Sequence, residues 1–126
     1  LVLATLHTND AASAVTRWID MGGEPFLLSS SLLGVLAQRL VRKYCGTCHG
    51  KGCEACGHTG YAGRTGVFEL LVTDDAIRAQ IHAQASEAEI RTAALAAGMT
   101  LMREDGERLI AAGITSREEV LRVTRD

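Results

Sequence analysis

All four cysteines of this 126-residue chain lie in one short segment, where they form two Cys-x-x-Cys pairs. Each pair presents two sulfur ligands on one tight turn, and two such turns complete the tetrahedral set of four thiolates that structural zinc prefers. Glycines crowd the same segment and supply the positive-φ positions that such turns need. The spacing therefore predicts a zinc site formed by Cys45, Cys48, Cys53 and Cys56.

Three other interpretations of the cysteine doublet stay open: structural disulfides, a redox dithiol and metal-free thiols. Disulfides are typical of secreted proteins, and a redox Cys-x-x-Cys normally occurs once, at the start of a helix. Metal-free thiols are therefore the main alternative to zinc. Because four sulfur ligands leave no open position for water, a zinc ion here would brace the chain and would not take part in catalysis.

The apolar run at residues 1–6 predicts a buried strand, and a cluster of polar residues follows it. His7, Thr8 and Asn9 come directly after this run. In open α/β sheets ligands bind beyond the carboxyl ends of the strands, so His7 is a candidate functional side chain. The alternative is that these side chains only cap the strand and the following helix.

The segments beside the cysteines predict a hairpin. Residues 34–44 fit either a helix or a strand, whereas residues 66–72 fit a strand better, and a cysteine turn between two strands favours strands for both. Upstream, Asp10 predicts the start of one helix, and Pro25 predicts the start of another.

Helical patterns dominate the chain after residue 72 and predict a small helical bundle over residues 73–126. Ser116 followed by Glu119 has the spacing of a capping box at a helix start. The alternating charges of residues 117–126 predict an ordinary solvated helix face.

The bulk composition is that of one modest globular domain or a piece of a larger protein. Hydrophobic residues make up 47% of the chain, and the formal net charge is −2, so no strong field favours nucleic acid as a partner. The sequence opens on Leu1 without an initiator Met or a signal peptide, so we expect a cytoplasmic chain cut from a longer one.

Four ordered motifs resemble the secretion ATPases, the hexameric motors of type II secretion and type IV pilus assembly. The match is closest to the type II secretion members and spans nearly the whole chain. The motifs are T-L-H-T-N at 5–9, P-F-L-L-S-S-S-L-L-G-V-L-A-Q-R-L-V-R at 25–42, G-Y-A-G-R-T-G-V-F-E-L-L at 60–71 and G-I-T-S-R-E-E-V-L-R-V-T at 113–124.

This resemblance implies an α/β fold, the C-terminal portion of a RecA-like ATPase core that carries a cysteine zinc-knuckle hairpin and is followed by a small helical bundle. The implied divisions are 1–44 for the core, 45–60 for an abridged tetracysteine subdomain, 61–72 for a returning core strand and 73–126 for the helical subdomain. The subdomain is abridged because the family usually has a much longer stretch between its two cysteine pairs.

The resemblance also implies roles for individual residues. His7 matches the histidine expected near the γ-phosphate of ATP, and Thr8 and Asn9 would lie close to the nucleotide. Arg17 and Arg64 match arginines expected at subunit contacts or near the nucleotide. The four cysteines match the metal ligands. The implied partners are other copies in a homo-hexamer and the secretion platform proteins of the bacterial inner membrane, to which the motor would be peripheral.

No phosphate loop of the pattern Gly-x-x-x-x-Gly-Lys-[Ser/Thr] occurs in this sequence. The resemblance implies that this loop and the carboxylates for Mg²⁺ lie upstream of Leu1, so ATP and Mg²⁺ are expected as cofactors of the full-length parent only. We expect this chain alone not to hydrolyse ATP. The alternative function is a stand-alone zinc-knuckle binding module, similar to the zinc domains of co-chaperones, which would leave the four flanking motifs without an explanation.

Overall fold

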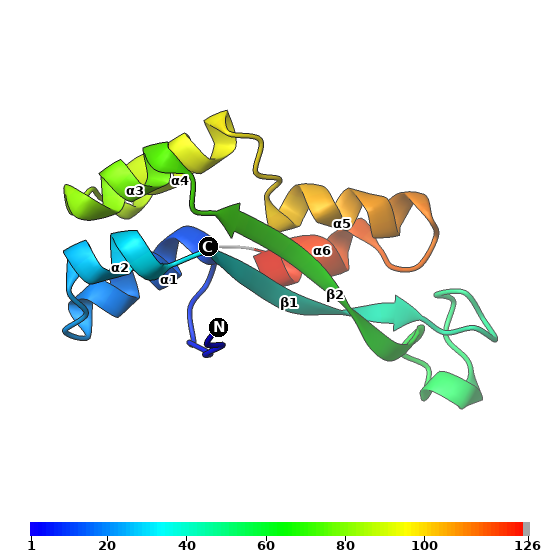
Figure 1. Ribbon diagram of the computed structural model, residues 1–126. Helices are drawn as coiled ribbons and strands as arrows, with labels where there is room; N and C mark the ends of the chain where they lie inside the picture. Colours follow the sequence, from blue (N-terminus) through cyan, green and yellow to red (C-terminus); the bar gives the residue numbers. More distant parts are fainter. Residues whose placement is uncertain (125–126) are drawn as a thin grey trace. The chain divides into compact units, whose positions relative to one another are not determined.

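The computed structural model describes residues 1–124. Within them the chain forms two compact units, and two strands pair in one sheet (Figure 1). The first unit consists of residues 1–37 and 69–100. The second consists of residues 38–68 and the described residues from Leu101 onward.

The sheet is the predicted hairpin of β1 (Gly34–Tyr44) and β2 (Tyr61–Val72), in which β2 begins five residues before the strand that the residue pattern predicts at 66–72. The side chains of β1 alternate between exposed and half-buried or buried, the pattern of a strand with one covered face. Backbone hydrogen bonds close both ends of the hairpin. The Cys45 N–H donates to the Gly60 carbonyl over 2.9 Å, and the Thr73 N–H donates to the Leu33 carbonyl over 3.1 Å.

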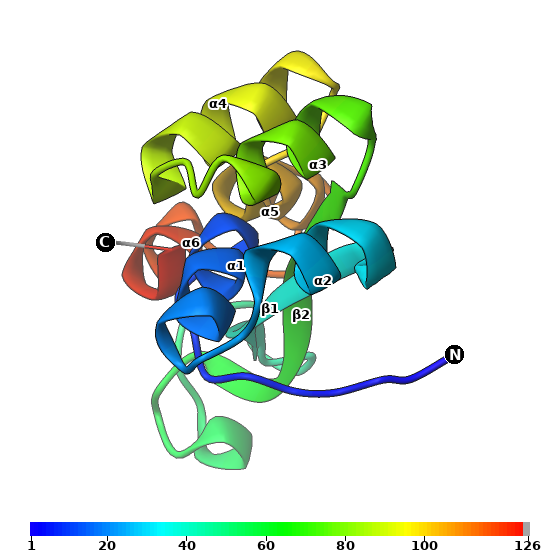
Figure 2. The same ribbon diagram turned by 60° about the vertical axis from the view of Figure 1, so that its left-hand side comes forward.

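Four helices build the first unit. In it α3 packs on α2, while α4 packs on α1 and α3 (Figure 2). The largest fully buried side chains at their centre are Val15, Leu71, Ile77, Ile81 and Ile90. The helices are α1 (Ala11–Asp20), α2 (Pro25–Ser31), α3 (Asp75–His82) and α4 (Glu87–Ala96).

The predicted helix starts are confirmed. Asp10 caps α1, where its carboxylate accepts the Ser13 N–H over 2.8 Å, and Pro25 is the first residue of α2. At the start of α1 the Asp10 oxygen satisfies an N–H that has no partner inside the helix, whereas α2 begins at Pro25 without a side-chain cap.

The second unit packs α5 (Met102–Ala111) against α6 (Arg117–Thr124), and its core includes residues of both strands. Val41 and Val67 are fully buried, and Leu109 and Val120 are at most 2% exposed. Gly106 lets the two helices approach closely, because a Cβ there would lie 2.4 Å from a methyl carbon of Val120.

The predicted strand at residues 1–6 is wrong. These residues adopt no regular secondary structure, and Leu1, Val2 and Leu3 are at least 87% exposed. A strand is stabilised by hydrogen bonds to a neighbouring strand, and among the described residues β1 and β2 pair with each other. An apolar run therefore did not suffice to form a strand here.

The boundaries of the two compact units differ from the domain boundaries predicted at residues 44, 60 and 72. Those domain boundaries refer to a whole protein and stay a prediction. The four helices after residue 72 divide between the units, with α3 and α4 in the first and α5 and α6 in the second. Among residues 1–124, no helix has the length and apolar character needed to cross a membrane.

Gly106→Ala should lower the free energy of unfolding by about 1–3 kcal/mol, because the added methyl group overlaps Val120. The gain in helix propensity, about 1 kcal/mol, does not offset this overlap. Urea unfolding measures the effect, and Val120→Ala provides the control background. There the same glycine substitution should cost nothing, and an equal cost in both backgrounds would contradict the packing of α5 on α6.

Candidate metal centre

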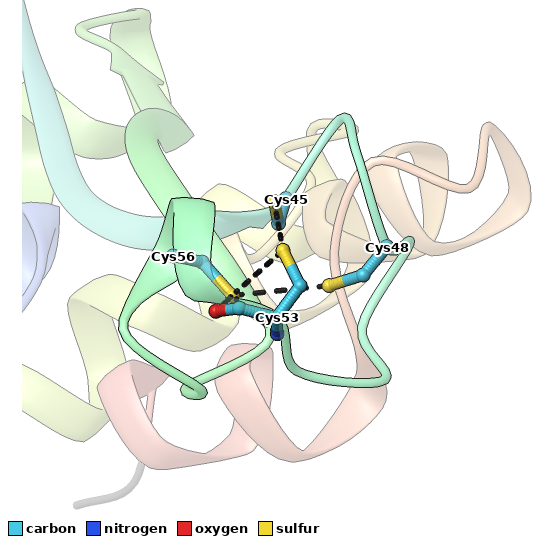
Figure 3. Close-up of side chains that lie close together, drawn as sticks. All are labelled: Cys45, Cys48, Cys53 and Cys56. Atoms are coloured by element: carbon cyan, nitrogen blue, oxygen red, sulfur yellow. Dashed lines mark hydrogen bonds between the residues drawn. The ribbon is translucent and has the colours of Figure 1, made fainter.

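The four cysteine sulfurs converge beyond the end of β1, where two loops bring them together (Figure 3). All four Sγ atoms lie within 4.8 Å of one another. The Cys45–Cys53, Cys48–Cys56 and Cys53–Cys56 Sγ···Sγ distances are each 3.8 Å. A tetrahedral zinc site with Zn–S bonds of about 2.3 Å has S···S edges of about 3.8 Å. Three of the six sulfur–sulfur distances thus have the length of a tetrahedral edge, and the other three are no longer than 4.8 Å, so the four sulfurs could hold one metal ion.

Backbone N–H groups point at the sulfurs. The Gly52 N–H donates to Cys48 Sγ over 3.1 Å, and the Gly60 N–H donates to Cys56 Sγ over 3.2 Å. The Cys53 N–H also donates to Cys56 Sγ, over 3.3 Å. Such donors favour the charged thiolate, which is the form that binds metal.

The two cysteine turns repeat each other's backbone conformation at an interval of eight residues. After the second cysteine of each pair, the first, second and fourth residues all have positive φ. In the first turn these angles are 53°, 93° and 96°, and in the second they are 64°, 63° and 84°. The six residues are His49, Gly50 and Gly52 in the first turn and Gly57, His58 and Gly60 in the second.

The turns also contact each other through equivalent positions. A Cβ on Gly52 would lie 3.1 Å from the carbonyl oxygen of His58, and a Cβ on Gly60 would lie 2.7 Å from that of Gly50. Gly60 is equivalent to Gly52, and His58 is equivalent to Gly50, because each lies eight residues later in the chain. Exchanging the two turns therefore converts one contact into the other, and the turns are related by an approximate two-fold axis. Gly60 is essential to this arrangement, because any side chain there would collide with backbone.

The sulfur environments separate the thiol pKa values. Backbone hydrogen bonds, chiefly from Cys53, lower the pKa of Cys56 to about 6, and those from Cys48 and Thr47 lower the pKa of Cys45. Burial, with the neighbouring thiols, raises the pKa of Cys53 to about 11. A bound metal would therefore have to displace the proton of Cys53, as metal ligation of thiols generally does.

A buried carboxylate that the sequence did not reveal joins the hairpin to α6. Glu119 is 2% exposed, and it accepts the Arg42 backbone N–H over 2.9 Å and the Arg42 Nη2 over 2.6 Å. Arg122 Nη2 donates to the same carboxylate over 2.9 Å. Hydrogen bonds from Arg122, and then from Arg42, hold the pKa of Glu119 at about 2 despite its burial.

These contacts correct two expectations for α6. Ser116 does cap the helix, since its Oγ accepts the Glu119 N–H over 3.1 Å, but the Glu119 carboxylate is held by the two arginines. The predicted solvated face is wrong at Glu119, although Arg117 and Glu118 are exposed. Residues 125 and 126 of that predicted face lie outside the described residues.

Aromatic rings connect this network to the cysteine turns. Tyr44 and Tyr61 stack with ring centres 5.6 Å apart, and the Arg42 guanidinium lies 4.5 Å from the centre of the Tyr61 ring. The Tyr61 hydroxyl hydrogen-bonds Ser116 Oγ over 2.7 Å. Gly50 packs on the Tyr44 ring, where a Cβ would lie 2.8 Å from a ring carbon. Contacts thus run without interruption from the metal ligands to α6.

The remaining predicted site residues lie apart from the cysteines along the chain. His7 and Asn9 are exposed, and the Thr8 hydroxyl donates to the Asp10 carbonyl over 3.2 Å. Arg17 is exposed on α1, and Arg64 is exposed on β2. Their roles at a nucleotide or a subunit contact stay predictions.

The comparison with protein families identifies this chain. The family model described as type II/IV secretion system protein matches residues 1–122, and the chain belongs to that family. It is 63% identical to type II secretion system protein HxcR of Pseudomonas aeruginosa. It is 46% identical to type II secretion system ATPase E of Vibrio cholerae and 47% identical to type IV pilus assembly ATPase PilB of Thermus thermophilus.

The chain spans a minor part of these relatives. The matches to HxcR and to the Vibrio cholerae ATPase each cover all of this chain, and they cover 29% and 30% of those relatives. The match to PilB covers 96% of this chain and 17% of the relative. The alignment with the Vibrio cholerae ATPase runs over 151 positions against 126 residues here, so that relative has residues in the matched region that this chain lacks. The alignment with HxcR runs over 134 positions.

A solved structure has the same fold. The pilus retraction motor PilT with bound ADP superposes with a TM-score of 0.72 at 26% identity, over all of this chain and 33% of that one. The predicted α/β fold, shared with a motor protein of known structure and carrying a cluster of four cysteines, is confirmed.

Glu119→Gln should lower the free energy of unfolding at pH 7 by about 1–3 kcal/mol, a range that allows for the solvent screening of its half-exposed arginine partners. The folded-state pKa of Glu119 is depressed, so the stabilisation is complete above pH 4.5 and is lost as the pH falls toward 2. Urea unfolding of both proteins from pH 7 to pH 2 should show their difference shrinking in that window.

Glu118→Gln is the matched control, because it removes the same charge from an exposed neighbour on α6. It should change the free energy of unfolding by less than about 0.5 kcal/mol. A difference between wild type and Glu119→Gln that stays constant down to pH 2 would contradict the assigned ion pairs.

Proposed function

We propose that this chain is the C-terminal part of a type II secretion motor, which couples ATP hydrolysis to pseudopilus assembly and protein export. The family match over residues 1–122 carries this proposal. The names of the relatives, two type II secretion proteins and a type IV pilus assembly ATPase, support a motor function. The identity of 63% with a type II secretion protein favours secretion over pilus assembly.

The proposed working form is a homo-hexamer at the cytoplasmic face of the bacterial inner membrane, where platform proteins hold it. His7 would lie near the γ-phosphate with Thr8 and Asn9 beside it, and Arg17 and Arg64 would lie at subunit contacts or near the nucleotide. The exposure of His7, Arg17 and Arg64 supports roles at surfaces that other parts of the motor cover. ATP and Mg²⁺ would be bound by a phosphate loop and carboxylates that this sequence does not contain.

We propose zinc as the ion of the tetracysteine site. Four sulfur ligands within 4.8 Å of one another suit zinc, and no cysteine is paired in a disulfide among the described residues. With all four positions filled by protein, the ion would ionise the thiols and tie the turns together. It would not activate water.

The stand-alone zinc-knuckle module is the less favoured function. It accounts for residues 45–60 alone, whereas the family match extends from residue 1 to residue 122.

Purified protein should contain about one zinc per chain, because the four sulfurs form a single site. The double variant Cys45→Ser/Cys48→Ser should lose the ion, since only two thiolates remain. Elemental analysis with thermal melting tests this, and Thr47→Ser is a control that leaves every ligand in place. A cooperatively folded wild-type chain without metal would contradict the zinc assignment.

The isolated chain should bind no ATP and hydrolyse none, whereas the whole motor should do both. His7→Ala in the whole motor should lower kcat roughly a hundredfold, because a positioned group near the γ-phosphate is lost. His49→Asn is the control, since it replaces an exposed histidine at a positive-φ position that Asn tolerates. A His7→Ala motor with unchanged kcat would refute the proposed role of His7.

A further inference from the structure

A buried carboxylate on β2 reaches the start of α1. Glu69 is 3% exposed, and its Oε2 accepts the backbone N–H of Ala11 over 2.9 Å. Ala11 is the first residue of α1 and is fully buried. The contact joins residues 58 positions apart in the sequence, so local helix preferences do not explain it.

The position suits a negative charge. The first N–H groups of a helix have no partner inside the helix, and the helix dipole is positive at that end. Burying a carboxylate without such donors costs free energy. The Ala11 N–H offsets this cost for Glu69, which points inward from its strand. Because Glu69 takes the Ala11 N–H, this donor is committed to the protein and is not left for a phosphate.

A second charged contact fixes the residue just before. Arg91 on α4 donates to the Asp10 carboxylate over 2.6 Å and to Glu87 over 2.5 Å. The other Asp10 oxygen caps α1 at Ser13. Burial alone would raise the pKa of Asp10, but the hydrogen bonds from Ser13 and Arg91 outweigh it and hold that pKa below its usual value.

These contacts hold the segment that carries the candidate histidine. Thr8 is tied to the Asp10 carbonyl by its hydroxyl, and Asp10 and Ala11 are tied to α4 and β2. His7 itself is exposed at the outer end of the anchored segment. All of these residues belong to the first compact unit. The anchor therefore limits where the imidazole can reach while leaving its ring free of buried contacts.

We propose that Glu69 and Arg91 are positioning residues for His7 in the ATPase reaction. They hold the segment from Thr8 to Ala11 against β2 and α4, so that the histidine meets the nucleotide in one place. This rests on the role proposed for His7 above. Neither residue touches the nucleotide in this arrangement, and both act through the backbone of the histidine segment.

The first test measures the anchor itself in this chain. Glu69→Gln keeps the volume of the side chain but removes its charge, so amide hydrogen exchange at Ala11, followed by NMR, should quicken about tenfold or more. Exchange in α3 should not change. Glu89→Gln is the matched control, because it makes the same change at an exposed position on α4. Unchanged exchange at Ala11 would overturn the proposal.

The second test measures catalysis in the whole motor. Glu69→Gln should lower kcat roughly tenfold, since small displacements of a positioned group are costly, and should leave KM within twofold. Arg91→Met gives a milder break, because the Arg91 side chain is 30% exposed, and Arg91→Lys should restore part of the lost rate.

The outcomes separate the two proposals. If His7→Ala lowers kcat while Glu69→Gln and Arg91→Met do not, the positioning role is wrong and the role of His7 stands. If His7→Ala leaves kcat unchanged, the role of His7 is wrong, and the positioning role falls with it. A fall in kcat for all three variants, with KM preserved and the Glu89→Gln motor unaffected, is the expected result.

Discussion

The close approach of four cysteine sulfurs is the constraint on which the second unit depends. Ionised sulfurs spaced 3.8 Å apart repel one another unless a cation and hydrogen-bond donors compensate them. The two turns supply N–H donors from equivalent positions, and they pack backbone against backbone at Gly52 and Gly60. The donors, the glycines and the eight-residue repeat are consequences of bringing two ligand pairs to one point.

The effect of this site extends beyond the turns because the ligands adjoin the strand ends. Cys45 follows Tyr44 and is hydrogen-bonded to Gly60, and the two tyrosine rings stack on that closure. Arg42 lies against Tyr61 and carries the contact on to Glu119. A metal with no open position would thus act mechanically, by keeping the cysteine end of the hairpin and α6 together.

Local signals in the sequence were sufficient for the convergence of the four cysteines, the hairpin and the starts of α1 and α2, because spacing and turn or cap preferences act over a few residues. Local signals were insufficient where the structure of a segment or the role of a side chain depends on residues far away in the sequence. Residues 1–6 are apolar but form no strand, since pairing requires a neighbour. The roles of Glu119 and Glu69 depend on Arg42 and Ala11, which lie 77 and 58 residues away. Charge alternation on α6 gave no sign that one carboxylate is buried.

The most direct test is amide hydrogen exchange of this chain with and without a zinc chelator. If the metal secures the second unit, removing it should expose the amides of Tyr44, Cys45 and Val120 to exchange, while those of Ile77 and Ile81 in the first unit stay protected. Unchanged protection at Tyr44 and Val120 after complete removal of the metal would contradict the account, since the hairpin and α6 would then be held without it.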